Sequence, residues 1–213
     1  MGHCRGTGFQ RWEFAVEDCV AFPWNGGWSV NEHVQNIIIG DNKLAARAAL
    51  QQAELEGFHT EILANELQGE ARQVGRELAH RLRVNTSSEP RPFCWIAGGE
   101  TTVTLGPGSG EAIKANGKGG RNQELALAAV NELRDLPNVF LISVATDGDD
   151  GPTDAAGAVV TGESARRAET LGLDAAGYLS RNDSYSFFQA LDDLLKTGPT
   201  GTNVNDLVFL CAL

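Results

Sequence analysis

The chain has 213 residues, of which 42% are hydrophobic and 21% charged, and its formal net charge is −11. This composition is typical of a globular protein with one large domain or two small ones. The negative charge disfavours a nucleic-acid partner, whose phosphates it would repel. No apolar run approaches the ~20 residues that span a bilayer, so we expect no membrane partner. The four cysteines are widely spaced, which indicates a cytoplasmic protein and argues against a zinc site or disulfide framework.

The first 33 residues differ from the rest of the chain. They hold three of the four tryptophans and show neither a helical nor a strand-like apolar period. We expect residues 1–33 to be an irregular lead or a remnant of something longer. Residues 34–213 are expected to form a single domain.

From residue 34 onward, short apolar runs alternate with helical patterns. The expected strands are 34–40, 58–63, 93–100, 101–106, 138–148, 157–162 and 206–213. The expected helices are 43–57, 69–83, 121–136, 163–172 and 184–198. Strand, helix and strand within residues 34–63 predict a βαβ unit with parallel strands. The alternation predicts an α/β fold, a three-layer α/β/α domain with a mixed, mostly parallel sheet.

The segment ATDGDDGPTDAAG (145–157) follows the most convincing buried strand and carries four aspartates: Asp147, Asp149, Asp150 and Asp154. Ligands of open α/β sheets gather beyond the carboxyl ends of strands. Converging carboxylates would repel one another unless a cation offset them, and Mg²⁺ is the usual partner of such oxygens. The alternative is a turn in which the aspartates accept backbone N–H groups. The segment alone does not decide between these interpretations.

A glycine-rich segment, GPGSGEAIKANGKGG (106–120), leads into the helix that begins RNQE. Backbone amides at such a helix start can hold an anion, and Lys114, Lys118 and Arg121 would add positive charge. The segment matches neither the P-loop nor the dinucleotide G-x-G-x-x-G pattern. A third segment, TGPTGTNVNDL (197–207), is dense in polar side chains, which favours turn chemistry when taken alone.

Four ordered blocks, GGRNQELALAA, TDGDDGPTDAAGAVV, DSYSFF and TGPTGTNVNDL, together resemble the C-terminal MOFRL domain of the class II glycerate kinases. Members of this family have also been called hydroxypyruvate reductases. The resemblance implies ATP-dependent phosphorylation of D-glycerate to 2-phosphoglycerate with Mg²⁺, in a cleft between two α/β/α domains. It predicts that this chain is half of such a kinase, inactive as an isolated fragment, with an N-terminal kinase domain as its missing partner.

With this resemblance, roles can be assigned to the polar segments. Arg121, Asp147 and Asp154 are the candidate catalytic residues, and Asp147 and Asp150 are the candidate Mg²⁺ ligands. The candidate residues for binding glycerate or ATP are Gly119, Gly120, Asn122, Thr200, Thr202 and Asn203.

Two other function classes stay open. The chain could be a non-catalytic α/β module that binds an anion or a partner, or an NAD(P)H-dependent hydroxypyruvate reductase. The reductase is disfavoured because the sequence shows no dinucleotide fingerprint. A homodimer is a further possibility that the sequence does not test.

Overall fold

The computed structural model describes residues 38–105 and 117–213. The expected lead (1–33), the first part of the expected strand 34–40, and most of the glycine-rich segment with Lys114 lie outside the described residues. Residues 38–213 form one compact unit.

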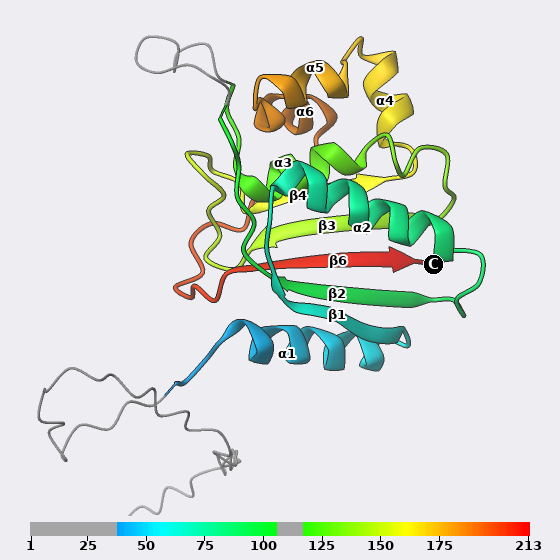
Figure 1. Cartoon of the computed structure of the whole chain (residues 1–213), viewed down its shortest axis with the longest axis vertical. Coiled ribbons are helices and arrows are strands. Elements are labelled where there is room, and N and C mark those ends of the chain that lie inside the picture. Colours follow the sequence, from blue (N-terminus) through cyan, green and yellow to red (C-terminus); the bar gives the residue numbers. More distant parts are fainter. Residues whose placement is uncertain (1–37, 106–116) are drawn as a thin grey trace, which may run out of the picture. The chain divides into compact units, whose positions relative to one another are not determined.

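The core of this unit is a six-stranded sheet (Figure 1). Its strands are β1 (His59–Leu67), β2 (Phe93–Gly99), β3 (Val139–Ala145), β4 (Gly157–Thr161), β5 (Leu194–Leu195) and β6 (Asp206–Ala212). They lie side by side in the order β1-β2-β6-β3-β4-β5. The C-terminal strand β6 therefore occupies the middle of the sheet.

The sheet is mixed, but the expectation that it is mostly parallel was wrong. Only β1 and β2 form a parallel pair; β6 is antiparallel to both β2 and β3, and β4 is antiparallel to β3 and β5. The reason is the position of β6. Because β6 is antiparallel to both of its neighbours, β2 and β3 run in the same direction, and its insertion replaces a parallel contact between them by two antiparallel ones.

Helices cover both faces of the sheet, which confirms the three-layer α/β/α architecture (Figure 1). They are α1 (Asn42–Leu55), α2 (Ala71–Asn85), α3 (Arg121–Ala129), α4 (Ser164–Thr170), α5 (Ala175–Ser180) and α6 (Ser184–Leu191). On one face α1 packs through Ala46 against Ile96 of β2 and Cys211 of β6. The remaining helices lie on the opposite face, where the larger apolar core includes Trp95 and Leu210.

Helix α3 lies at the centre of that larger core. Every residue from Asn122 to Ala129 is buried, because α2, α5 and α6 pack on it while it rests on β3 and β4. The approach of α2 is close: a Cβ added to Gly75 would stand 2.1 Å from the Leu125 carbonyl oxygen. The polar start of α3 is therefore held rigidly at one edge of the sheet.

Some expected elements differ from the structure. Residues 38–40 and 101–105 form no strand; Thr102 makes only an isolated bridge to Glu70. The helix expected over 184–198 ends at Leu191, because Asp192 adopts a left-handed conformation (φ 59°) and the chain turns into β5. Helix α5 was not anticipated. None of the helices in the described part of the chain is long and apolar enough to cross a bilayer.

Candidate active site

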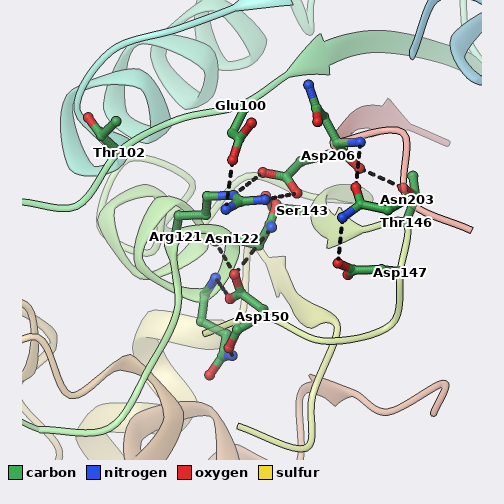
Figure 2. A network of polar contacts seen from close by, with 12 residues as sticks. Glu100, Thr102, Arg121, Asn122, Ser143, Thr146, Asp147, Asp150, Asn203 and Asp206 are labelled. Atoms are coloured by element: carbon green, nitrogen blue, oxygen red, sulfur yellow. Dashed lines mark hydrogen bonds and ion pairs between the residues drawn. The ribbon is translucent and has the colours of Figure 1, made fainter. Parts of the chain in front are cut away.

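The sheet topology brings three strand ends together at one edge. Gly99, the last residue of β2, and Ala145, the last residue of β3, are both register partners of Asp206, the first residue of β6. The segments that follow β2 and β3 therefore leave the sheet on either side of Asp206. Arg121, the first residue of α3, reaches the same point (Figure 2).

Arg121 is held by two carboxylates. Its Nε donates to Asp206 Oδ2 at 2.5 Å and its Nη2 donates to Asp206 Oδ1 at 3.0 Å. On the other side, Nη1 lies 3.0 Å from Glu100 Oε1. The hydrogen bond to Asp206 is the main cause that raises the pKa of Arg121. Arg121 therefore lies where the sequence predicted a ligand-facing cation, but its charge is already offset by the protein.

Asp150 occupies the start of α3. Its Oδ1 accepts the backbone N–H of Asn122 at 3.0 Å and its Oδ2 accepts that of Gln123 at 2.9 Å. The Asn122 side chain also donates to Asp150 Oδ1 and accepts a hydrogen bond from the Ser143 hydroxyl. Asp150 is 1% exposed, and this burial raises its pKa.

For Asp150, this arrangement favours the turn interpretation of the aspartate segment, in which a carboxylate accepts backbone N–H groups. Its carboxylate fills the helix N-terminus that the sequence offered to an outside anion, as a capping anion of the protein itself. Both Asp150 oxygens accept backbone amides in a buried position, an arrangement that favours the capping role over the expected role as a Mg²⁺ ligand. Asn122 is likewise buried in this network, so its side chain serves the cap.

The glycines before α3 are required by packing. A Cβ added to Gly120 would lie 2.3 Å from Asp150 Cγ, and one added to Gly119 would lie 2.1 Å from Ser184 Oγ. Real Cβ atoms do not approach other heavy atoms so closely. Gly119 and Gly120 thus let the aspartate cap and the start of α6 close onto this segment.

Asp147 meets the polar segment 197–207, as the sequence suggested. Its Oδ2 accepts a hydrogen bond from the Asn203 amide at 3.1 Å, and its backbone carbonyl accepts the Thr200 N–H at 3.0 Å (Figure 2). The Thr200 hydroxyl donates to the Thr146 carbonyl and accepts the Thr202 N–H. Asp147 is half-buried, whereas Thr200, Thr202 and Asn203 are exposed.

Asp154 has different partners from Asp147 and Arg121. Its Oδ1 accepts a hydrogen bond from the Tyr185 hydroxyl at 2.6 Å, and its Oδ2 accepts one from the Lys196 ammonium at 3.0 Å. These two contacts lower its pKa to about 2. The structure therefore joins Asp154 to α6 and to the residue after β5.

The MOFRL family model matches residues 93–206, which is more than half of the chain. The chain belongs to the MOFRL family. This MOFRL chain is 43% identical over 183 residues to the D-glycerate 2-kinase of Thermotoga maritima, an alignment that covers 83% of the chain and 42% of the relative. It is 39% identical over 226 residues to the human glycerate kinase, with 84% and 42% covered.

A solved structure gives the same result. The crystal structure of glycerate kinase from Thermotoga maritima superposes with a TM-score of 0.75 at 41% identity, covering 82% of this chain and 41% of that one. The MOFRL chain thus spans less than half the length of these two relatives and of this solved structure.

Within the described parts of this MOFRL chain, no three histidine, cysteine or acidic side chains are grouped so that they could hold a metal ion. Asp147, next to the exposed Asp149, remains the candidate for Mg²⁺. Protein sites often bind Mg²⁺ through one or two carboxylates, with substrate phosphates and water completing the shell. The residues present therefore fit a cation that arrives with a phosphate ligand.

Glu100 and Asp206 were not identified as site residues from the sequence. Both residues stand at the ends of predicted strands. Glu100 follows the apolar run FCWIAGG, and Asp206 precedes the apolar run LVFLCAL. A signal existed, since charged residues directly outside apolar strands lie where open sheets bind ligands. What the sequence could not show is that β6 lies beside β2 with its first residue opposite Gly99.

Proposed function

We propose that this chain is the C-terminal part of an ATP-dependent D-glycerate 2-kinase, which forms 2-phosphoglycerate. The observation that carries this proposal is the convergence of Arg121, Asp147 and Asn203 at one sheet edge, in a MOFRL chain whose relatives are named glycerate kinases. Phosphoryl transfer depends mainly on positioning and charge neutralisation, for which no nucleophilic side chain is needed.

Arg121 would bind the glycerate carboxylate. Its contacts with Asp206 and Glu100 use at most three of the five N–H donors that a guanidinium carries, so two or more are left for a ligand. Asp206 and Glu100 fix the plane of the guanidinium before the substrate arrives. A carboxylate that binds there meets donors that are already oriented, which lowers the entropic cost of binding.

Asp147 would hold the reacting hydroxyl. Asn203 fixes one of its oxygens and the Asp149 N–H bonds the other, so the carboxylate is oriented at the exit of β3. In this position Asp147 can accept the proton of the glycerate 2-hydroxyl. Bound Mg²⁺–ATP would supply the phosphoryl group to be transferred and offset the negative charge at this edge.

The test is ADP release from ATP with D-glycerate as acceptor. We expect the chain alone to be inactive, and to gain glycerate-dependent activity when the separately expressed N-terminal part of the Thermotoga maritima D-glycerate 2-kinase is added. A parallel assay of NADH oxidation with hydroxypyruvate is expected to show no turnover. Hydroxypyruvate-dependent NADH oxidation without ADP release would contradict the proposal and support the reductase.

One observation favours a non-catalytic module as the second candidate. Asp150 fills the start of α3, and Asp206 and Glu100 offset the charge of Arg121. The charged groups at the start of α3 therefore already have partners within the chain. A folded chain that binds the added N-terminal part yet releases no ADP would support this candidate. Size-exclusion chromatography with light scattering would determine whether the chain forms the homodimer that the sequence left open.

A further inference from the structure

Two lysines and a tyrosine form a cluster beside the site, which we call the lysine–tyrosine cluster: Lys118, Tyr185 and Lys196. The Lys118 Nζ stands 3.8 Å from the centre of the Tyr185 ring. The Lys196 Nζ lies 3.3 Å from the Tyr185 hydroxyl oxygen and 5.6 Å from the ring centre. Both lysines are exposed, whereas Tyr185 is 6% exposed. Two ammonium groups are thus anchored on one buried ring.

The backbone holds Lys118 in place. Its N–H donates to Asp183 Oδ1 at 3.0 Å, and its carbonyl accepts the Tyr185 N–H at 2.8 Å. Asp183 is the N-cap residue of α6. Because the main chain is bonded on both sides to the start of α6, the Lys118 side chain is presented from a fixed base.

The cluster is joined to the sheet edge by three chain segments. Each runs from an edge residue to a cluster residue or its partner: Arg121 to Lys118, Asp147 to Asp154, and Asn203 to Lys196. Three residues of extended chain span at most ~10 Å and seven at most ~24 Å. The shortest connection keeps Arg121 within ~10 Å of Lys118 along the backbone, a distance that one elongated ligand can span.

The charges at the two places differ in sign. At the edge, Arg121 faces the carboxylates of Asp206 and Glu100, and Asp147 and Asp149 add further negative charge. In the cluster, Lys196 faces the carboxylate of Asp154, and the Asp183 carboxylate at the Lys118 backbone is paired with Arg181. The ion pairs of the described residues include Lys196 with Asp154 but none with Lys118. Phosphate oxygens that carry no bound cation are therefore attracted to the cluster more than to the edge.

We propose that Lys118 and Lys196 bind phosphate oxygens of a nucleoside triphosphate, while Tyr185 fixes the two ammonium groups. The identity of the ligand rests on the proposed function; the preference for a polyphosphate rests on the charges alone. Asp154 competes with the ligand for Lys196 and so limits the affinity of the empty cluster. The role of Asp154 is then to hold the Lys196 ammonium in position until a phosphate group takes the place of the Asp154 carboxylate.

Inorganic tripolyphosphate is the probe, and isothermal titration calorimetry of the full chain is the measurement. We expect Lys118→Gln and Lys196→Gln each to weaken binding about fivefold and the double variant by more than tenfold. Lys118→Arg keeps the charge and should bind within about threefold of the wild type. The matched control is Lys43→Gln, an exposed lysine of α1 that lies 3.8 Å from Glu66.

Asp154→Asn gives a result of opposite sign. Removing the competing carboxylate should tighten tripolyphosphate binding about threefold, which loss of structure would not do. Circular dichroism of each variant confirms that it is folded. Absence of tripolyphosphate binding by the wild type, or equal binding by the wild type and the folded double variant, overturns the proposal.

The same variants separate this inference from the kinase proposal. Tripolyphosphate binding that depends on the two lysines, in a chain that shows no glycerate-dependent ADP release with the added N-terminal part, upholds the cluster and contradicts the kinase. ADP release with an unchanged KM for ATP in the double variant contradicts the cluster and upholds the kinase.

Discussion

Arg121 and Asp206 form a two-point ion pair that joins the first residue of α3 to the first residue of β6. Asp206 is 5% exposed, so the carboxylate depends on Arg121 to offset its charge. The pair ties the central strand to the central helix at the candidate active site. It therefore serves both the stability of the fold and the orientation of the guanidinium.

Asp206→Asn should lower the free energy of unfolding by about 2 kcal/mol. Removing one partner of a buried ion pair costs ~3–5 kcal/mol, and the partial exposure of Arg121 reduces this. The matched control is Glu100→Gln, because Glu100 pairs with the same arginine but is exposed and should cost less than ~1 kcal/mol. Urea unfolding measures both. Equal losses in the two variants would show that the burial of Asp206 is not what matters.

Asp150→Ala should be more damaging than any other aspartate substitution in residues 145–157. It leaves the buried N–H groups of Asn122 and Gln123 without their acceptors, which costs about 3 kcal/mol. The neighbouring Asp149 is exposed, and Asp149→Ala should stay within ~0.5 kcal/mol of the wild type. Chemical denaturation checks both values. An Asp150→Ala variant as stable as Asp149→Ala would argue against the capping role.

Gly120→Ala should lower stability by about 1–3 kcal/mol, because the new methyl group would press on Asp150. Gly40→Ala is the control, since its Cβ would have the nearest atom at 4.0 Å. The control should be neutral or slightly stabilising, by up to ~1 kcal/mol, through its effect on the unfolded chain. Thermal unfolding of the two variants compares them. A Gly120→Ala variant with unchanged stability would contradict the packing role of Gly120 and favour the expected role in ligand binding.

The contribution of Asp154 to stability should depend on pH. The Tyr185 hydroxyl and the Lys196 ammonium lower its pKa from the ordinary 3.8 to about 2 in the folded state. The folded protein then binds fewer protons than the unfolded chain between these values, so stability rises with pH there. The contribution is complete above pH 4 to 5 and is lost as the pH falls toward about 2.

Urea unfolding of the wild type and Asp154→Asn at several pH values measures this dependence. The wild type should be the more stable protein near pH 6, and the difference should shrink as the pH falls through about 3. Because Asp154 and Lys196 are both exposed, added salt should reduce the difference in stability between the wild type and Asp154→Asn. A difference that does not change with pH would mean that the Asp154 charge plays no part.

The sequence predicted the individual strands and helices better than it predicted which strands lie side by side in the sheet. Apolar runs such as residues 138–148 marked the strands, and the helical pattern of residues 43–57 marked α1. The position of β6 between β2 and β3 could not be predicted, because strand order depends on contacts between residues far apart in the chain. Cys94 and Cys211 show the same limit: widely separated in sequence, they are register partners on adjacent strands.

The candidate site was predicted in part for a similar reason. The sequence grouped Asp147 with Asn203 only through the family resemblance; they meet because β6 is antiparallel to β3, which places the residues before β6 beside the end of β3. The role of Asp150 could not be anticipated, because an acidic residue on a turn rich in glycine suits both a metal ligand and a helix cap. Only the burial of Asp150 and its two bonds to backbone amides separate these roles.

The most direct measurement is glycerate-dependent ADP release by a hybrid in which residues 38–213 replace the matching part of the Thermotoga maritima D-glycerate 2-kinase. The hybrid should be active, and Arg121→Lys and Asp147→Asn should each lower kcat/KM by about 10²-fold or more, since both change groups aimed at the substrate. Circular dichroism establishes that the variants are folded. Folded variants that keep ADP release within a few-fold of the unsubstituted hybrid would contradict the placement of the active site at this edge.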